Sequence, residues 1–291
     1  MTIINHVIVI PVFNDWRSLS KLLIKINFLF KKTNKISTEI LILDDNSSEK
    51  ISIDFKKLKF LKRIQVLRLK ENLGSQKTIA IGLDYLKKNK KDFFVTVMDG
   101  DGEDSPYQIK KMLNVASRNK NFVVTANRKK RKESLIIIIL YKIHLLITFL
   151  FTFKWISFGN FSTFHKENLN KILSGNSSWY AHSSSIIKNC NIKRLYSKRE
   201  RRYYDKSKLG LFALIEHSLR VNAVFINNIF FSSISYLLII ILLMPNNSQI
   251  FLVSGIISFN LVVIFIKIKH WIKNLSKISK FKKSIKLIKT F

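Results

Sequence analysis

The chain has 291 residues, of which 47% are hydrophobic, and carries a formal net charge of +33. This length allows one large domain or two smaller ones. The charge requires an anionic partner, which is either nucleic acid or an anionic membrane face. The single cysteine, Cys190, excludes an internal disulfide and a cysteine metal cluster and suits a reducing compartment.

Roughly the first 125 residues alternate between apolar runs typical of buried strands and segments of helical periodicity. Strands are expected at residues 3–12, 39–43, 64–69, 93–98 and 122–126, with helices over residues 16–30 and after residue 75. The first run is too short and too poor in flanking positive charge to be a signal peptide. The alternation predicts an α/β fold built on a doubly wound, mostly parallel sheet.

Carboxylates follow three of these strands, at Asp15, Asp44 and Asp99. The carboxyl ends of parallel strands meet at one edge of the sheet, where ligands bind in open α/β folds. Asp99 and Asp101 flank Gly100 on a turn that can aim both side chains at Mg²⁺ or Mn²⁺. An isolated D-x-D is more often a solvated acidic turn, but three converging clusters favour a binding site.

Four short motifs occur in order at the ends of these strands: Val-Ile-Pro-Val-Phe-Asn-Asp at 9–15, Leu-Asp-Asp-Asn-Ser-Ser at 43–48, Asn-Leu-Gly at 72–74 and Asp-Gly-Asp at 99–101. Together they resemble the successive motifs of family 2 glycosyltransferases with the GT-A fold. The resemblance covers about the first 130 residues. It extends to the bacterial polyprenyl-phosphate and dolichol-phosphate type, which has two C-terminal transmembrane helices.

The resemblance implies roles for the residues at these strand ends. The nucleotide-sugar donor would be held by Pro11, Asn14, Asp15, Asp44, Asp45, Asn72, Gly74 and Asp99. Asp99 and Asp101, with Glu103 where related enzymes often have Gln, would be the catalytic, metal-binding carboxylates. Their cofactor would be Mg²⁺ or Mn²⁺, which neutralises the nucleoside diphosphate as it leaves.

Further motifs resemble those that lie beside the acceptor phosphate in the polyprenyl-phosphate enzymes. Arg128 and Arg131 match an R-x-x-R pattern, whose guanidinium groups suit phosphate oxygens. A later R-x-x-G-x-S-K-Y signature is matched by Arg202, Ser207 and Lys208, with Asp205 where Gly is expected. The alternative for the first segment is a solvated or lipid-facing basic surface, and the alternative for the second is a basic juxtamembrane loop.

Asn160 stands where the Gly-Asp-Phe segment of these enzymes has its Asp. An amide cannot accept the proton of a sugar hydroxyl, so one candidate base is missing. Asp104, Asp205, His165 and His182 remain as candidates, and their spacing singles out none of them.

Residues 134–153 are almost wholly apolar but carry Lys142 and His144. A lysine in the middle of a spanning helix is costly. We therefore expect a helix that lies in the membrane interface, with a third transmembrane span as the alternative. His144, Thr148 and Thr152 form a polar stripe at helical spacing.

Two later apolar runs, at about 221–244 and 250–268, predict a transmembrane hairpin within residues 216–270. The connector 245–249 has no charge, whereas lysines and arginines flank the pair. By the positive-inside rule, the GT-A domain at 1–215 and both termini are cytoplasmic. Residues 271–291 are expected to form a basic tail that is amphipathic or disordered and lies on anionic lipid.

The sequence thus predicts an inverting glycosyltransferase of the bacterial cytoplasmic membrane, with a nucleotide sugar as donor and a polyprenyl phosphate as acceptor. Within the enzyme class, the alternative acceptor is a hydroxyl of a lipid-linked glycan in cell-envelope synthesis. An inactive membrane-tethered binding module is the alternative outside it. Nucleic acid is not expected as a partner, because the lysines flank apolar runs and no nucleic-acid motif accompanies them. A homo-oligomer is left open.

Overall fold

The computed structural model describes residues 3–33, 35–89, 91–128, 135–204, 210–244, 246–278 and 285–291. The chain divides into two compact units. One unit comprises residues 1–132, 158–207 and 280–291, and the other comprises residues 133–157 and 208–279.

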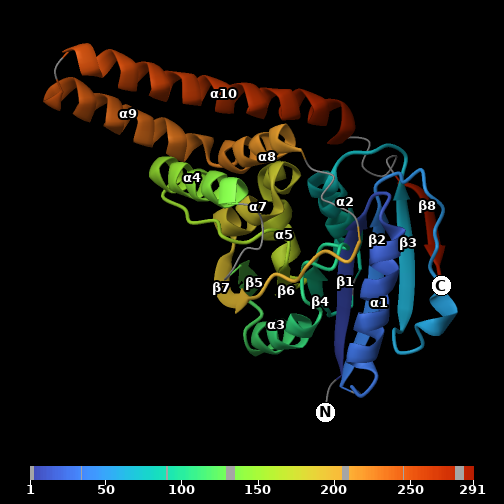
Figure 1. The fold of residues 1–291 in the computed structure, drawn as a ribbon. Helices are drawn as coiled ribbons and strands as arrows, with labels where there is room; N and C mark the ends of the chain where they lie inside the picture. Colours follow the sequence, from blue (N-terminus) through green and yellow to red (C-terminus); the bar gives the residue numbers. More distant parts are fainter. Residues whose placement is uncertain are drawn as a thin grey trace. The chain divides into compact units, whose positions relative to one another are not determined.

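The first unit is built on a sheet of eight strands, drawn as arrows in Figure 1. The strands are β1 (Ile4–Val12), β2 (Ile36–Asp44), β3 (Arg63–Leu69), β4 (Phe94–Val97), β5 (Phe122–Arg128), β6 (Ser162–His165), β7 (Asn191–Ser197) and β8 (Ile285–Thr290). Their order in the sheet is β7-β5-β6-β4-β1-β2-β3-β8. β1, β2, β3 and β4 pair in parallel, as do β5 and β7, while β6 and β8 run antiparallel to their neighbours.

Helices cover both faces of this sheet. They are α1 (Trp16–Phe30), α2 (Ser75–Lys87), α3 (Tyr107–Arg118), α5 (Asn168–Leu173), α6 (Ser177–Tyr180) and α7 (His182–Asn189). Apolar residues of α1 and α3 share one buried cluster with Ile8, Ile10, Ile40 and Ile42 of the central strands. Successive residues of a strand point to opposite faces of the sheet. Leu43, which follows Ile42, therefore lies on the other face, where its side chain contacts Gly82 of α2. The central strands are thus buried on both sides, as their continuous apolar runs predict.

The five predicted strands and the first predicted helix are confirmed, and the sheet is mostly parallel, as expected. β6 and β7 were not predicted. β6 is four residues long, and its sequence Ser-Thr-Phe-His lacks the apolar run that marked the other buried strands.

The predicted basic tail at 271–291 differs from the structure. Residues 246–278 belong to one helix, and residues 285–290 form β8 on the outer edge of β3. The rings of Phe55 and Phe291 stack with centroids 4.1 Å apart beside this pairing. An unpaired strand edge offers a row of backbone donors and acceptors, and β8 satisfies those of β3. The expectation of an amphipathic or disordered arm is therefore wrong for residues 285–290.

The second unit contains α4 (Leu135–Thr152), α8 (Leu211–Ala223), α9 (Ile226–Leu243) and α10 (Asn246–Ile278). Among the described residues, two helices are long and apolar enough to cross a membrane, at Ile226–Leu243 and Gln249–His270. The apolar part of α4, Ile138–Thr152, is shorter than these two. Lys269 and His270 of α10 both contact Glu216 of α8, at 3.2 Å and 3.0 Å.

Polar side chains one helical turn apart on α9 cap the end of α4. Ser232 Oγ donates to the carbonyl oxygen of Phe151 at 2.8 Å, Asn228 donates to that of Thr152, and Tyr236 donates to that of Leu150. The last carbonyls of a helix have no partner within it, and an unpaired carbonyl is costly away from water. The stripe on α9 thus allows α4 to end in apolar surroundings. The predicted polar stripe of α4 is also present, because Thr148 contacts His144 and Thr152 donates to the carbonyl oxygen of Thr148.

Candidate functional site

The carboxyl ends of β1, β2 and β4 lie at the same edge of the sheet. Val12 of β1 pairs with Asp44 of β2, and Val9 pairs with Val97 of β4. The backbone N–H of Asp45 also donates to the carbonyl of Val12 at 2.9 Å. The three carboxylate clusters predicted from the sequence therefore meet along one edge.

Asn14 joins the loops that follow β1 and β2. Its side-chain oxygen accepts the backbone N–H groups of Ser48 at 2.8 Å and Glu49 at 3.2 Å, and its own N–H donates to Ser47 Oγ at 3.0 Å. Asn14 has a positive φ of 48°, a conformation that Asn tolerates better than most residues. Its role here is to hold the two loops together.

Asp45 joins the same edge to the loop after β3. Its two carboxylate oxygens each accept a backbone N–H, from Leu73 and Gly74, at 2.8 Å. Asn72 also accepts the N–H of Gly74, at 3.1 Å, where Gly74 adopts a φ of +82° just before α2. Burial raises the pKa of Asp45, while these backbone donors oppose that shift.

Asp44 is fully buried at the last position of β2. Its Oδ1 accepts the backbone N–H of Ser47 at 2.8 Å, and its Oδ2 lies 3.5 Å from Nε of Arg68. Arg68 also donates to the carbonyl oxygen of Ser47. A buried carboxylate requires such partners, so Asp44 organises the loop that contains Ser47.

The Asp-Gly-Asp turn follows β4 directly and packs against β1. A Cβ at Gly100 would lie 3.2 Å from Ile10 Cγ2 and 3.3 Å from the carbonyl oxygen of Pro11, which is why the turn needs a residue without one. Asp99 Oδ1 accepts the side-chain amide of Asn160 at 2.8 Å. The backbone N–H of Asp99 donates to Asp104 at 3.1 Å. Asp99 is thus oriented from two sides.

Asp101 is bridged to Asp15 by the guanidinium group of Arg202. Arg202 Nη1 lies 3.1 Å from Asp101 Oδ2, and its Nη2 binds Asp15 Oδ2. The other oxygen of Asp101 accepts the backbone N–H of Glu103 at 3.0 Å. Glu103 itself pairs with Arg199. Two arginines from the segment after β7 therefore reach the D-x-D turn.

Burial and the neighbouring charges of Asp99 and Glu103 raise the pKa of Asp101 to about 7, although Arg202 opposes the shift. Crowded carboxylates are the hard oxygen ligands that Mg²⁺ and Mn²⁺ prefer, and a cation relieves their repulsion. The donor chemistry therefore fits a divalent cation on Asp99 and Asp101. Within the described residues, no group of three His, Cys, Asp or Glu side chains could hold a metal ion by itself.

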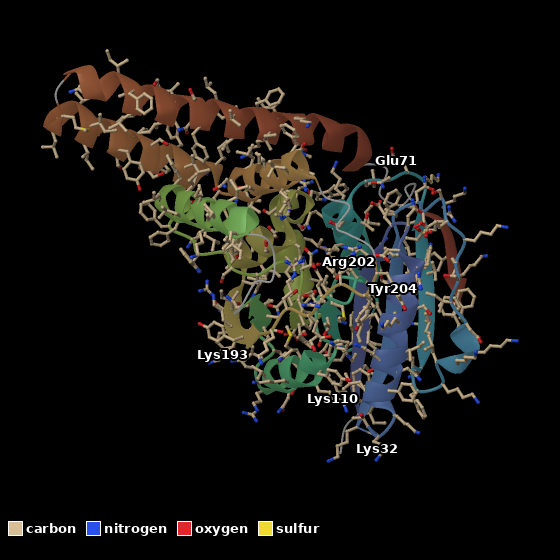
Figure 2. All side chains as sticks on the ribbon, viewed as in Figure 1. Lys32, Glu71, Lys110, Lys193, Arg202 and Tyr204 are labelled. Carbon is tan, nitrogen blue, oxygen red and sulfur yellow. The ribbon has the colours of Figure 1, made fainter. Side chains whose placement is uncertain are left out.

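Residues 198–204, which follow β7, lie along this turn and α1. Backbone N–H groups of Glu200 and Tyr203 donate to the carbonyl oxygens of Glu103 and Asp101, at 2.9 Å and 3.0 Å. The ring of Tyr203 packs on Gly102, which has a φ of +87°, and a Cβ there would lie 2.3 Å from Tyr203 Cε2. Figure 2 labels Arg202 and Tyr204 beside the upper ends of β1 and α1. We call residues 198–204 the basic strap.

The basic strap also makes cation–π contacts with α1. The guanidinium of Arg17 lies 4.0 Å from the centroid of the Tyr204 ring, and Lys25 Nζ lies 4.5 Å from that of Tyr203. On its other side the strap borders an open pocket of about 750 Å³. The pocket is lined by Ser105, Gln108, Tyr196, Ser197, Lys198, Arg199, Glu200 and Arg201. A basic, solvent-open pocket thus adjoins the carboxylate turn.

The family model for glycosyl transferase family 2 matches residues 7–183, which include most of β1 and all of β2 to β6. The chain belongs to glycosyl transferase family 2. A comparison with curated protein sequences finds no match.

Comparison with solved structures finds several glycosyltransferases that are similar to this chain. Glucosyl-3-phosphoglycerate synthase from Mycobacterium tuberculosis, in complex with Mn²⁺, UDP and glucosyl-3-phosphoglycerate, is 13% identical, with 77% of this chain and 79% of that chain covered and a TM-score of 0.52. Mannosyl-3-phosphoglycerate synthase from Rubrobacter xylanophilus is 16% identical over 76% of this chain and 72% of that chain, with a TM-score of 0.49. The structure of Staphylococcus aureus TarS residues 1–349 with UDP-GlcNAc is 14% identical. The comparison covers 79% of this chain and 70% of that chain, with a TM-score of 0.48.

In this family 2 glycosyltransferase, the predicted donor-side residues lie along one edge of the sheet. Pro11, Asn14, Asp15, Asp44, Asp45, Asn72, Gly74, Asp99 and Asp101 all belong to it. Glu103 is paired with Arg199, so its role as a metal ligand stays a prediction. Of the predicted acceptor-side residues, Arg202 reaches the carboxylates. The side chain of Arg128, and Arg131, Ser207 and Lys208, lie outside the described part of the chain.

Sequence reasoning missed Gln76 and Arg199. Gln76 is buried in the first turn of α2 and donates to Asn160 at 3.1 Å. A polar residue two positions after the Asn-Leu-Gly motif was a signal that could have pointed to Gln76. Arg199 lies in a run of five charged residues, 198–202, and nothing in that run distinguishes it from its neighbours.

Proposed function

We propose that this chain transfers a sugar from a nucleotide sugar to a polyprenyl phosphate on the cytoplasmic face of a bacterial membrane, with inversion at the anomeric carbon. The observation that carries the proposal is the bridge of Arg202 between Asp15 and Asp101. It brings a phosphate-binding side chain to the carboxylates expected to hold the donor.

On the donor side, Asp99 and Asp101 would hold a divalent cation together with the diphosphate of the nucleotide sugar. Such an ion neutralises negative charge on the leaving nucleoside diphosphate. The M. tuberculosis relative in this fold class contains Mn²⁺ and UDP, which supports the same donor chemistry here. Two protein carboxylates leave coordination positions for phosphate oxygens, as is usual for Mg²⁺.

On the acceptor side, the nature of the nucleophile decides what the protein must supply. A sugar hydroxyl needs a base to take its proton, whereas a lipid phosphate is already anionic and needs only to be positioned. The guanidinium groups of the basic strap suit that task, because their fixed donors match phosphate oxygens. The pocket lined by Lys198, Arg199 and Arg201 offers the space and the charge.

The surroundings of the candidate bases also favour a phosphate. Asn160 uses its amide to donate to Asp99, and Asp104 accepts the backbone N–H of Asp99. His165 is fully buried and bound to Asp92, which precedes β4 and so lies at the other end of that strand. His182 is fully buried beside Ser162. Asp205 is outside the described residues.

The helices of the second unit suit a lipid substrate. α9 and α10 expose large apolar residues along most of their length, among them Phe230, Leu242, Phe251 and Phe265. Apolar helices of this length satisfy their own backbone groups and can cross a bilayer. We propose that they anchor the catalytic unit at the cytoplasmic membrane, within reach of an acceptor that is held there by its own hydrocarbon chain.

The proposal is tested by offering the purified full-length protein a panel of nucleotide sugars with either undecaprenyl phosphate or a lipid-linked sugar. Products are identified by mass. We expect one nucleotide sugar to give a glycosylated undecaprenyl phosphate, and that mass also identifies the sugar. Glycosylation of the lipid-linked sugar alone would overturn the phosphate acceptor in favour of a hydroxyl. Binding of donor without any product would indicate an inactive binding module.

A further inference from the structure

A closed ring of buried hydrogen bonds lies behind Asp99. Gln76 Nε2 donates to Asn160 Oδ1 at 3.1 Å, and the backbone N–H of His182 donates to Gln76 Oε1 at 2.7 Å. His182 Nε2 lies 3.0 Å from Ser162 Oγ, which donates to the carbonyl oxygen of Asn160 at 3.1 Å. All four side chains are at most 9% exposed. The ring joins the first turn of α2, the start of α7 and the strand β6.

The ring determines the direction in which each amide points. A backbone N–H can only donate, so the atom of Gln76 that faces His182 must be its oxygen. The nitrogen of Gln76 then faces Asn160, which must present its own oxygen. The nitrogen of Asn160 is left to face Asp99, an acceptor. Side-chain amides are usually ambiguous in orientation, but here a backbone donor at one end and a carboxylate at the other fix both.

The rest of the ring agrees with this polarity. Burial lowers the pKa of His182 to about 3, so its imidazole is neutral and carries one N–H. The single hydroxyl proton of Ser162 goes to the carbonyl oxygen of Asn160. The contact between Ser162 Oγ and His182 Nε2 then needs its proton from the histidine. His182 therefore carries its proton on Nε2 and donates it to Ser162 Oγ. Each contact then has one donor and one acceptor.

We propose that Asn160 is a positioning residue for Asp99, and that Gln76, through this ring, fixes the amide of Asn160 with its N–H toward the carboxylate. The inference rests on the proposed function, in which Asp99 is a ligand of the divalent cation. One oxygen of Asp99 is held by Asn160, so the other keeps a fixed direction for the cation. Hydrogen-bonded partners of metal ligands act in this way, and their loss typically weakens metal binding about 10- to 100-fold.

The position of Gln76 makes the inference testable without touching the carboxylates. Gln76→Met has nearly the same volume but removes both amide contacts, so Asn160 Oδ1 loses the donor that holds it and the amide can move away from Asp99. Asn160→Ala removes the contact itself. Asn168→Ala is the matched control, because Asn168 is a buried amide of the same unit that donates to the carbonyl oxygens of Lys120 and His165.

The experiment titrates Mn²⁺, alone and with UDP, into the purified full-length protein and follows free Mn²⁺ by electron paramagnetic resonance. We expect Asn160→Ala and Gln76→Met each to weaken Mn²⁺ binding about 10-fold or more. Asn168→Ala should bind as the unaltered chain does. Adding Gln76→Met to Asn160→Ala should weaken binding little further, since both act through one contact. Thermal unfolding of each variant without metal measures the loss of stability separately.

Two outcomes would overturn the inference: Mn²⁺ binding that is unchanged in Asn160→Ala and Gln76→Met, or equal weakening in Asn168→Ala. Failure of the unaltered chain to bind Mn²⁺ would also overturn it. If only the proposed acceptor is wrong, the result is different. Mn²⁺ binding would still depend on the ring, but undecaprenyl phosphate would not be glycosylated. If Asn160→Ala does not fold, Gln76→Met and Asn160→Ser decide the question, because serine keeps a small donor at this position.

Discussion

The guanidinium of Arg202 lies 3.1 Å from the carboxylate of Asp101, although 101 residues separate the two in the chain. The contact places a positive charge among half-buried carboxylates that would otherwise repel one another. Without a metal ion, Arg202 neutralises part of the negative charge of these carboxylates. We propose that the same guanidinium binds phosphate oxygens once donor and acceptor are bound.

Replacing Arg202 with alanine should therefore slow sugar transfer. A hydrogen bond to a charged group contributes about 1.5–3 kcal/mol, which corresponds to roughly 10-fold or more in rate. Initial rates with undecaprenyl phosphate measure the effect. Arg63→Ala is the control, because Arg63 also pairs with a carboxylate, Glu39, but belongs to the start of β3, the end away from the site. Equal rates for Arg202→Ala and the unaltered chain would remove Arg202 from the acceptor site.

Gly102→Ala should displace the basic strap. Gly102 adopts a φ of +87°, where a residue with a Cβ is strained by about 1–2 kcal/mol, and the new Cβ would collide with the Tyr203 ring. Trypsin should then cut faster after Lys198, Arg199 and Arg201. Gly210→Ala is a suitable control, because within the described part of the chain nothing beyond its sequence neighbours lies within 4 Å of the Cβ that it would add. Equal cleavage rates in both variants would mean that Gly102 does not hold the strap.

Most of the GT-A sheet could be predicted because its central strands are buried on both faces. Runs such as residues 39–43 and 93–98 have a composition that only an interior strand explains. β6 could not be predicted, since it is four residues long and owes its place to pairing with β4 and β5. β8 could not be predicted for another reason: two lysines interrupt its short apolar sequence, and its partner β3 is more than 200 residues away in the chain.

The placement of the residues expected to bind the donor could be predicted, because their motifs directly follow strands whose order fixes where the motifs lie. The placement of the arginines proposed to bind the acceptor depends on a long-range contact of the basic strap. Arg199 and Arg202 have the same local sequence environment, yet one pairs with Glu103 and the other bridges Asp15 and Asp101. The backbone hydrogen bonds of Glu200 and Tyr203 to the turn, together with the packing of Tyr203 on Gly102, set that register.

The protein should lose stability as the pH falls below about 6.5. His6 and His182 are fully buried, and burial lowers the pKa of each to about 3 from 6.5. Between these values the unfolded chain binds protons that the folded chain excludes, so the free energy of unfolding is highest above pH 6.5 and falls toward pH 3. The free energy of unfolding should fall by on the order of a few kcal/mol between pH 6.5 and pH 3.

His6→Gln should reduce this acid sensitivity, because the glutamine amide can still bind Thr96 Oγ1, which His6 contacts at 2.8 Å, and does not titrate. Thermal unfolding at pH 7.5 and pH 5 measures the difference. His217→Gln, at a half-buried histidine of α8, is the control. If His6→Gln and the unaltered chain lose the same thermal stability between pH 7.5 and pH 5, protonation of His6 is not a cause of the acid sensitivity.

The connector between α9 and α10 should face the outside of the cell. A cysteine introduced as Asn247→Cys, in a chain whose one native cysteine is removed by Cys190→Ser, should react with a membrane-impermeant maleimide on intact bacterial cells. A cysteine placed by Lys32→Cys, at an exposed position after α1, should react only after lysis. Labelling of Asn247→Cys that also requires lysis would reverse the proposed topology.

The most direct test compares undecaprenyl phosphate with undecaprenol as acceptors for the purified protein, because the two lipids differ only in the phosphate group. The product mass is recorded for the unaltered chain and for Asp99→Asn and Asp101→Asn, with Asp92→Asn as a carboxylate control outside the site. We predict a glycosylated product from undecaprenyl phosphate alone, made by the unaltered chain and Asp92→Asn, and little or none from the two D-x-D variants, although these remain folded. Transfer to undecaprenol at a comparable rate, or full activity in both D-x-D variants, would contradict sugar transfer to a lipid phosphate at this carboxylate edge.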